Sequence, residues 1–425
     1  MTTRRPMEFR EFVRQCGDNG SLAVVGEPCA CASVPARVAR EERGPNRALL
    51  FDRIVDADAK IVGNLFGSSE RLCQAASVPD QAQLCAQIEH AIERPLAVGR
   101  SVPRGKEYTL RRNPDLRCLL PQIRYSGGDA APYLTSGIAI ARDAAYARWH
   151  ACYVRLQVLG GNRLLFNPAT PRIRQIVDAT VGCGQALDIA VAFGAPVELT
   201  LMACVSVAAH VDKLEVAQAL AGGGLAFAGE KVPAPLSTEY VLTGQVVPEY
   251  QREGPFGDLK GLYTMNDANP TFRVDELWER RDALFHSISA GISREHVELV
   301  TLGPRLHLER LKRRVPGILR YDIPAFGGGR FAVLVLKGGF KPDALIETLS
   351  TVPIIRGFAF INEDVASDSA ADLVWAMLQR SPDSACFRVA DQAHEVFREK
   401  KLFIDTTVDD PYCWEHRRVE LCDAA

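Results

Sequence analysis

The 425-residue sequence lacks several patterns that would assign it to common functional classes. It contains no run of about 18 apolar residues, the length that a membrane-spanning helix needs, and its N-terminus has no apolar signal core. Lys plus Arg number 50 and Asp plus Glu number 52, and no long block of one charge occurs. An excess of basic residues would indicate binding to nucleic acid or an anionic membrane. We therefore expect a cytoplasmic protein with neither kind of partner.

Motifs of metal, nucleotide and nucleophile chemistry are missing too. The 12 cysteines form no CxxC pair, and Cys29 and Cys31 are the only close pair. This argues against a zinc ribbon and favours free, mostly buried thiols. The sequence has no HExxH and no GxSxG, and its glycine triplets at 222–224 and 327–329 fit neither GxGxxG nor a P-loop. Function must therefore be inferred from less common segments.

The chain is long enough for two or three domains, and its patterns change twice along the sequence. The first hundred residues mix amphipathic helices with short strands. From about 121 to 289, strand patterns dominate, including 196–205, which predicts a barrel or half-open sheet. The last region alternates apolar strands with helices, which predicts a parallel sheet. The tail, 399–425, is predicted to end in a short polar helix that could dock on a partner subunit.

The segment REGPFGDLKGLY has the most distinctive pattern in the sequence. Gly254, Pro255 and Gly257 cannot belong to a regular helix, so we expect a tight, ordered loop. Glu253 and Asp258 stand at its two ends. If the loop brings both carboxylates to one partly dry pocket, their proton affinities separate, as general acid–base chemistry requires. The alternative is a solvated turn with two incidental acids, which is the commoner outcome for an arbitrary loop.

The segment ARWHACYVRLQVLG is predicted to form a strand. Its alternation puts Arg155 on the face opposite to His150 and Val154. An arginine in the middle of a sheet must find an anion or remain exposed. Its planar fork suits a substrate carboxylate or the loop acids, and a structural salt bridge is the alternative. Farther on, His296 is predicted to begin a helix, with a role in lining a site as the second interpretation.

These segments, taken in order, resemble the UbiD family of prenylated-FMN-dependent reversible decarboxylases. EGPFGD preceded by an RLQ strand is a specific combination, and RALLFDRI, PYLTSGIAIARD and FINEDVASDSAADLVWAMLQR are also similar to family segments. The resemblance covers nearly the whole chain. It implies an α+β and α/β multidomain fold. Its parts would be an N-terminal α+β domain (1–118), a central flavin-reductase-like split β-barrel (119–300) and a C-terminal α/β domain with a parallel sheet and a terminal oligomerisation helix (301–425).

The resemblance also implies an activity and its residues. The protein would be a carboxy-lyase that removes CO2 from an aromatic, heteroaromatic or α,β-unsaturated carboxylic acid. Prenylated FMN would carry the difficult bond changes, while the protein orients the acid and supplies a proton. By position, Arg155 matches the family's catalytic arginine, Glu253 its first acid and Asp258 the second acid, the proton donor. A flavin prenyltransferase would supply the cofactor, and a homodimer or higher homo-oligomer is expected.

The sequence departs from the family at the metal that bridges the flavin phosphate. The family binds this divalent ion through Asn, His and Glu, and His150, Arg172 and Lys213 stand at those positions here. One residue of slip would put Asp212 in place of Lys213. Arg and protonated Lys offer no lone pair to a metal. We therefore expect no metal ligands and a phosphate held directly by basic residues.

The residues expected to bind the cofactor are His150, Val154, Arg155, Pro171, Arg172 and Lys213. A decayed flavin site is the alternative reading of the basic residues. Two other functions stay open on the same fold. The protein could bind plain FMN or another phosphorylated ligand, or it could be a non-catalytic accessory subunit.

Overall fold

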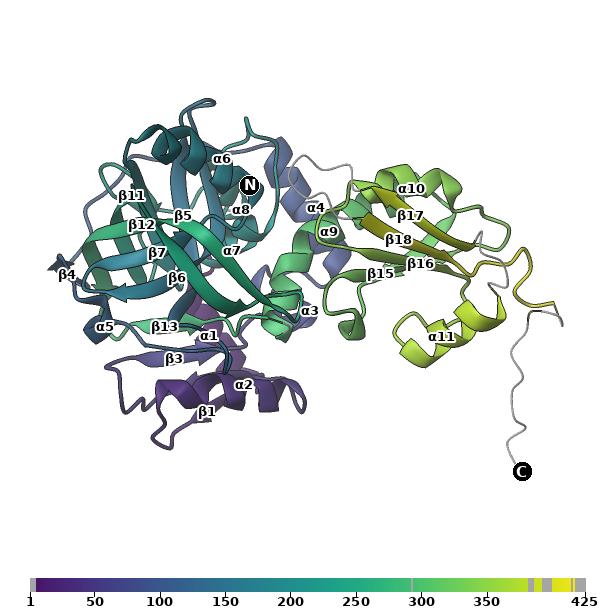
Figure 1. Cartoon of the computed structure of the whole chain (residues 1–425), viewed down its shortest axis with the longest axis horizontal. Coiled ribbons are helices and arrows are strands. Elements are labelled where there is room, and N and C mark those ends of the chain that lie inside the picture. Colours follow the sequence, from purple (N-terminus) through teal and green to yellow (C-terminus); the bar gives the residue numbers. More distant parts are fainter. Residues whose placement is uncertain (1–4, 292, 381–385, 392–399, 414–415, 417–425) are drawn as a thin grey trace. The chain divides into compact units, whose positions relative to one another are not determined.

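The computed structural model describes residues 5–291, 293–380, 386–391, 400–413 and 416. The chain divides into two compact units, Met1–Leu299 and Val300–Ala425 (Figure 1). The predicted division of the first 300 residues into two domains stays a prediction. All cysteines in the described ranges are free thiols, and more than half of them are buried.

The first part of unit 1 is a small α+β module. Its helices are α1 (Phe9–Asp18), α2 (Val34–Glu42), α3 (Ser69–Ala75) and α4 (Gln81–Glu93), with a 3-10 turn η1 (Cys31–Ser33). Its sheet has the order β1 (Leu22–Val25), β2 (Ala48–Phe51), β3 (Lys60–Gly63) and β13 (Leu284–Ser287). β13 pairs in parallel with β3, although more than 200 residues separate them in sequence. The module is therefore completed by a strand that follows the barrel.

A closed barrel of six antiparallel strands forms the rest of unit 1 (Figure 1). The order around it is β11 (Tyr240–Gly257), β8 (Leu187–Phe193), β5 (Tyr133–Asp143), β6 (Arg148–Gly160), β7 (Arg163–Asn167) and β12 (Tyr263–Arg280), and β12 pairs back with β11. β4 (Tyr108–Arg112) lies outside on β12. The inward residues of these strands form one apolar core, as alternation along a strand requires. The barrel that the sequence predicted is confirmed.

Short elements connect the barrel strands. They are α5 (Leu116–Leu119), α6 (Pro171–Thr180), the 3-10 turn η2 (Val181–Cys183), α7 (Val197–Cys204), α8 (Lys213–Leu220) and the pair β9 (Phe227–Ala228) and β10 (Ala234–Pro235). α6 and α8 both contact β6, the strand that carries Arg155. These two helices therefore bring their N-terminal residues to the strand on which the candidate site is built.

Two expectations about local structure were wrong. Within the predicted strand 196–205, residues Val197–Cys204 form helix α7 instead. Because residues 197–203 are all buried, the apolar run has no exposed face, and periodicity cannot separate a buried helix from a strand. The segment expected to be a loop is the bulged end of strand β11, which continues to Gly257 before a turn at 258–262. Register shifts in the β11–β12 ladder accommodate its glycines and proline.

Unit 2 is an α/β layer structure. Its sheet has the order β14 (Ile318–Asp322), β15 (Phe331–Leu336), β16 (Gly357–Ile361), β18 (Lys400–Asp405) and β17 (Phe387–Asp391). The central pairs β15–β16 and β16–β18 are parallel, so the predicted parallel sheet is confirmed. The boundary between the units falls within α9 (Arg294–Arg314), and a 3-10 turn, η3 (Ala325–Gly327), precedes β15.

Two separate apolar cores hold the helices of unit 2 against its sheet. α10 (Asp343–Ser350) packs on one face and α11 (Ala370–Gln379) on the other (Figure 1). This is the covering that a sheet with parallel central strands needs. The predicted terminal helix lies outside the described residues.

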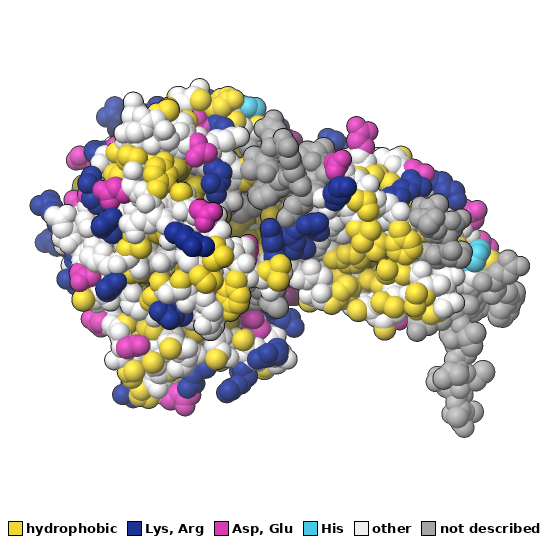
Figure 2. All heavy atoms as spheres, in the orientation of Figure 1, with side chains coloured by type: hydrophobic (Ala, Val, Ile, Leu, Met, Phe, Trp, Pro, Cys, Tyr) yellow, Lys and Arg dark blue, Asp and Glu magenta, His cyan; other side chains and the backbone are white. Residues whose placement is uncertain are grey.

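The faces of the two units seen in Figure 2 expose both charged and hydrophobic side chains. On unit 1, basic and acidic side chains are interspersed, whereas hydrophobic side chains gather on the visible face of unit 2 (Figure 2). Exposed apolar residues of unit 2 include Val374, Leu378, Val389 and Leu402. Among the described residues, no helix combines the length and the hydropathy needed to cross a bilayer.

Candidate active site

The centre of the candidate site is an ion pair between Arg155 on β6 and Glu253 on β11. Arg155 donates from Nε to Oε1 at 2.7 Å and from Nη2 to Oε2 at 3.0 Å. The Glu253 side chain is 1% exposed and that of Arg155 is 13% exposed. Nη1 of Arg155 makes no hydrogen bond to any described residue. The guanidinium therefore keeps donors for a second anion.

Three asparagines complete the surroundings of Glu253. Each donates its side-chain amide to Oε2: Asn167 at 2.7 Å, Asn269 at 2.8 Å and Asn266 at 3.0 Å. The sheet register explains this gathering, because Asn167 is the cross-strand partner of Arg155 and Asn266 that of Glu253. Five N–H donors thus face one carboxylate, which fixes the position of the Glu253 side chain.

Aromatic rings cover one side of this pair. The Arg155 guanidinium lies 4.6 Å from the centroid of the Phe256 ring, and Tyr133 packs on Phe256 at 4.4 Å between centroids. Burial, with a contribution from the Glu253 charge, raises the pKa of the Tyr133 hydroxyl. The rings restrict water around the ion pair, and contact with the face of Phe256 adds a cation–π attraction.

Asp258 lies at the end of the same hairpin, just past β11. Its Oδ1 accepts the backbone N–H of Leu259 at 2.5 Å, and the structure records no hydrogen bond between Asp258 and Arg155 or Glu253. The charge of Asp258 acts on His296 instead. Burial lowers the pKa of His296, and the carbonyl of Gly291 and Asp258 partly oppose this effect. Asp258, which closely follows Glu253 in the sequence, thus interacts with His296.

His296 is held at the first turn of α9, as the sequence predicted. Its Nδ1 lies 2.8 Å from the Gly291 carbonyl, a position that requires Nδ1 to carry the proton. Nε2 is then the acceptor of the neutral ring.

A buried lysine occupies one of the predicted cofactor positions. Lys213 is 2% exposed and donates from Nζ to the Ala151 carbonyl at 2.8 Å. Burial lowers its pKa to about 8. Burial and the Lys213 charge together lower the pKa of His150, whose Nε2 is buried without a hydrogen-bond partner among the described residues. Lys213 therefore lies close to His150, which is itself a residue of β6.

The start of α6 lies close to the same part of β6. Burial raises the pKa of Cys152, while the Lys213 charge and the neighbouring Thr170 side chain oppose that rise. Thr170 is the N-cap residue of α6 but does not cap the helix with its side chain, and Pro171 follows at the first helical position. A helix start without such a cap leaves backbone N–H groups that favour an anion.

The other two predicted cofactor residues are engaged differently. Arg172 forms an ion pair with the nearly buried Asp143, and its guanidinium stacks over the Tyr146 ring at 4.9 Å. Part of its charge is thereby neutralised within the protein. The side chain of Val154 packs inside the barrel core and is 2% exposed.

The residues that the resemblance puts at the metal positions do not fit a divalent ion. Of His150, Arg172 and Lys213, only His150 carries a lone pair at neutral pH. Asp212, the alternative ligand, is buried and accepts the backbone N–H groups of Leu214, Glu215 and Trp149. No cluster of three or more His, Cys, Asp or Glu that could hold a metal exists in the described part of the chain.

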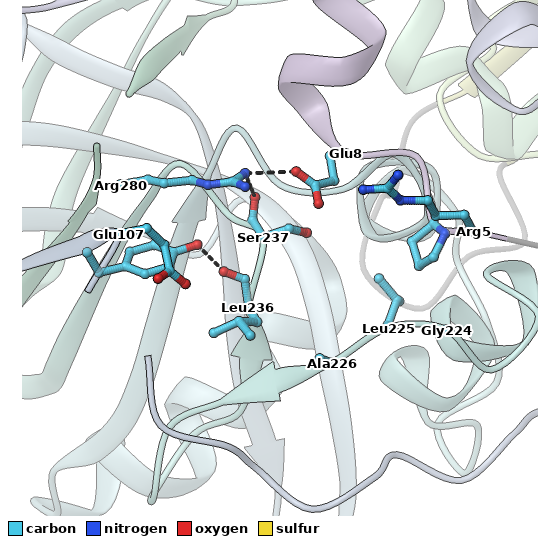
Figure 3. A pocket seen from close by; sticks show the side chains of 11 residues that line it. Arg5, Glu8, Glu107, Gly224, Leu225, Ala226, Leu236, Ser237 and Arg280 are labelled. Carbon is cyan, nitrogen blue, oxygen red and sulfur yellow. Dashed lines mark hydrogen bonds and ion pairs between the residues drawn. The ribbon is translucent and has the colours of Figure 1, made fainter. Parts of the chain in front are cut away.

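Unit 1 also contains a hollow of about 350 Å³ that is separate from these groups (Figure 3). Arg5, Glu8, Glu107 and Arg280 contribute charges of both signs to its lining. Figure 3 shows Arg280 turned toward Glu8, which it contacts at 2.9 Å. None of the predicted site residues lines this hollow, and its internal charge pairing leaves little net attraction for an anion.

Comparison with known protein families shows to which family the chain belongs. A domain profile described as the 3-octaprenyl-4-hydroxybenzoate carboxy-lyase Rift-related domain matches residues 98–293. A second profile, the N-terminal domain of the same carboxy-lyase, matches residues 18–90. Together the two profiles match more than half of the chain. The chain belongs to the UbiD family.

Relatives within the UbiD family match over almost the full length. A phenolic acid decarboxylase of Streptomyces sp. (strain D7) is 25% identical over an alignment 437 residues long. The alignment covers 94% of this chain and 92% of the relative.

Solved structures establish the likeness of the fold. The UbiD-class enzyme HmfF from Pelotomaculum thermopropionicum, in an evolved dimeric form in complex with prFMN, is 24% identical with a TM-score of 0.84, covering 98% of this chain and 97% of that one. The 3,4-dihydroxybenzoic acid decarboxylase AroY from Klebsiella pneumoniae, in its apo form, is 19% identical with a TM-score of 0.81, covering 99% and 98%.

Sequence reasoning missed the residues that surround the ion pair. Asn167, Asn266 and Asn269 stand in LLFNP and TMNDANP, segments whose turn-like composition hides a role in the site. The repeated occurrence of Asn near strand ends is the one sequence pattern that could have indicated these residues. Their convergence on one oxygen depends on the register of four strands, which no local pattern specifies.

Proposed function

We propose that this UbiD-family protein is a decarboxylase that uses prenylated FMN to remove CO2 from an aromatic, heteroaromatic or α,β-unsaturated carboxylic acid. The observation that carries the proposal is the Arg155–Glu253 pair, held by three asparagines at the barrel. The neighbours' cofactors and the activities in the relatives' names agree with it. Bound prenylated FMN would supply the electron sink for cleavage of the carbon–carbon bond.

Arg155 binds the substrate carboxylate in this proposal. Its Nη1 faces no described hydrogen-bond acceptor, and its charge already lies in a largely dehydrated position. Glu253 keeps the guanidinium in one orientation, so that the substrate meets a fixed donor instead of a flexible one. The pair therefore supplies orientation, which is the protein's share of a cofactor-driven reaction.

Asp258 supplies the proton that replaces CO2. It lies at the end of the hairpin that carries Glu253, and one carboxylate oxygen, Oδ2, has no hydrogen-bond partner among the described residues. The neutral ring of His296, through Nε2, is suited to accept a hydrogen bond from the protonated acid.

The cofactor phosphate is bound by basic residues without a divalent ion in this proposal. Lys213 bonds to β6, the strand that carries His150, and α6, with Arg172 at its second position, also contacts β6. A phosphate would attract a proton onto Lys213 and could displace Asp143 from Arg172. The buried Nε2 of His150, which has no described partner, suits a phosphate oxygen if it carries a proton.

Co-expression with a flavin prenyltransferase tests both parts of the proposal. The purified protein should show a modified-flavin spectrum and release CO2 from some members of a panel of aromatic and acrylic acids. Metal analysis should find less than about 0.1 divalent ion per flavin, and EDTA dialysis should leave the flavin bound. Stoichiometric manganese or magnesium, lost together with the flavin, would refute the metal-free site.

A second function has one observation in its favour. Asp143 neutralises Arg172, one of the two cations expected to bind the phosphate. The remaining charge favours a weaker site, for plain FMN or another phosphorylated ligand. A plain oxidised-flavin spectrum after co-expression would support this alternative. A colourless protein would point to the non-catalytic accessory subunit.

We also propose that the protein forms a homodimer or higher homo-oligomer. Unit 2 exposes large apolar side chains, among them Leu378 at 70% and Val389 at 62%, of the kind that oligomer contacts cover. Light scattering would measure the mass directly.

A further inference from the structure

The turn at residues 125–130 contacts the hairpin tip, residues 254–262, at several points. The tip separates Glu253 from Asp258, so its shape sets the relative placement of the two acids. The Ala130 N–H donates to the Pro255 carbonyl at 2.9 Å, and the Gly128 N–H donates to the Tyr263 hydroxyl at 3.0 Å. The turn thus holds the hairpin from both of its strands.

Asp129 is the most connected residue of this turn. Its side chain is buried, with the residue only 3% exposed. Oδ1 accepts the Gly257 N–H at 3.0 Å and the Ser126 hydroxyl at 2.7 Å. Oδ2 accepts the N–H groups of Tyr125 at 2.8 Å and Ser126 at 2.9 Å. One carboxylate therefore joins the turn to the residue directly before Asp258.

The turn and the hairpin tip approach each other so closely that a side chain at Gly254 would not fit. A Cβ built on Gly254 would lie 2.3 Å from the Cβ of Ala130. Real Cβ contacts are never so short, so glycine is required at this position for the turn to reach the hairpin. Gly254 directly follows Glu253, and Gly257 directly precedes Asp258. The contacts therefore occur next to each of the two acids.

We infer that Asp129 is a positioning residue for the reaction, which fixes Asp258 relative to the Arg155–Glu253 pair by holding Gly257. This inference rests on the proposed decarboxylase function. Every partner of Asp129 is a hydrogen-bond donor, so the site needs an acceptor-only group. Asparagine has the same shape but would turn an NH2 group toward N–H donors. Asp129→Asn therefore releases the hairpin tip with little change in volume.

The effect on catalysis follows from geometry. Misplacing a reacting group by about 1 Å costs about 100-fold in rate. In full-length, flavin-loaded protein, we expect Asp129→Asn to lower kcat about 10- to 100-fold. KM and flavin content should change less than about threefold, because Arg155 and the phosphate site stay in place. The pH profile of kcat should also shift, since the environment of the proton donor changes.

Amide hydrogen exchange provides a readout that needs no activity. In Asp129→Asn, peptides covering 253–263 should exchange at least about tenfold faster, while peptides from β5 and β6 keep wild-type rates. Asp188→Asn is the matched control, because Asp188 is a half-exposed carboxylate on β8 that accepts from Lys231 and Gln245. It should leave both the exchange at 253–263 and kcat at wild-type values.

The outcomes separate the two proposals. If flavin-loaded wild type releases no CO2 from any acid tested, the decarboxylase function fails, and exchange alone still decides whether Asp129 holds the hairpin tip. Unchanged exchange at 253–263 overturns the inference, and so does faster exchange with unchanged kcat. Should Asp129→Asn not fold, Tyr263→Phe removes the contact to Gly128 from an exposed side chain. It should lower kcat about two- to fivefold, and wild-type exchange and kcat in that variant would overturn the inference.

Discussion

Arg155 and Asn167 lie opposite each other across the β6–β7 ladder, and both side chains donate to Oε2 of Glu253. The strand register therefore places a cation and a neutral donor on the same carboxylate. The attraction within a buried ion pair offsets the free-energy cost of dehydrating both charges only when their remaining hydrogen-bonding groups also have partners. Here the asparagines are those partners on the carboxylate side. Nη1 of the arginine keeps hydrogen-bonding capacity that a substrate could use.

Replacing Glu253 with Gln should abolish turnover while leaving the flavin bound. The amide removes the negative charge opposite Arg155 and turns N–H groups toward other donors, so the guanidinium loses its fixed orientation. We expect kcat to fall at least about 100-fold and the free energy of unfolding to fall by about 2–3 kcal/mol. Glu249→Gln, an exposed acid on the same strand, is the control and should change neither. Full activity in Glu253→Gln would remove the assigned role.

Arg155→Lys tests whether the planar fork matters beyond its charge. Lysine keeps the positive charge but cannot bond both carboxylate oxygens of Glu253 while keeping donors for a substrate. We expect kcat/KM to fall about 100-fold. Arg163→Lys, an exposed arginine on the neighbouring strand β7, should retain wild-type kinetics. Equal kinetics in the two lysine variants would show that Arg155 supplies charge alone.

The centre of the site could be predicted because its signals are local. Alternation in ARWHACYVRLQVLG assigns Arg155 to one face of a strand, and an arginine on such a face needs an anion. The glycines and proline around Glu253 and Asp258 mark an irregular segment. Residue chemistry thus left a substrate carboxylate, the loop acids or a structural salt bridge as possible partners of Arg155, and the family resemblance selected Glu253. The resemblance to UbiD proteins supplied the order of these segments and the cofactor.

The rest depends on contacts that are distant in sequence. The three asparagines and Asp129 act through the register of the barrel and through a turn 128 residues away from Gly257. β13 follows the barrel strands in the sequence but pairs with β3 of the N-terminal sheet. The composition of residues 1–118 therefore cannot reveal this strand. α7 was mistaken for a strand because a fully buried apolar run has no periodic exposure. Each miss concerns tertiary packing rather than residue chemistry.

Lys213 should make the stability of the flavin-free protein depend on pH in an alkaline window. Burial lowers its pKa from 10.5 to about 8, so between these values the unfolded chain binds more protons than the folded one. Stability contributed by this site therefore rises with pH from about 8 to 10.5. Relative to Lys213→Met, wild type should gain on the order of 3 kcal/mol across the window. Urea unfolding at several pH values measures the difference, with the exposed Lys231→Met as control. Parallel curves for wild type and Lys213→Met would contradict the burial of a charged amine.

Glu42 should have a pH effect in the acidic range, at the place where α2 contacts the start of α9. Its Oε1 accepts the Arg294 N–H at 3.0 Å. Burial first, and then the Glu295 charge, raise the pKa of Glu42 from 4.5 to about 7. The folded state therefore binds more protons than the unfolded chain between these values, and stability contributed by this site falls as pH rises from about 4.5 to 7.

Glu42→Gln keeps an oxygen that accepts the Arg294 N–H, but its side chain cannot ionise. The variant therefore does not lose stability at this site as pH rises. The variant should match wild type near pH 4.5 and exceed it by on the order of 3 kcal/mol above pH 7. Glu41→Gln is the matched control on the same helix, where Arg47 lowers the pKa of the carboxyl group. Removing that favourable pair should reduce stability slightly at neutral pH. If Glu42→Gln is no more stable than wild type at pH 8, the Glu42 carboxylate is not strained by burial, and its interaction with α9 is favourable in the charged form.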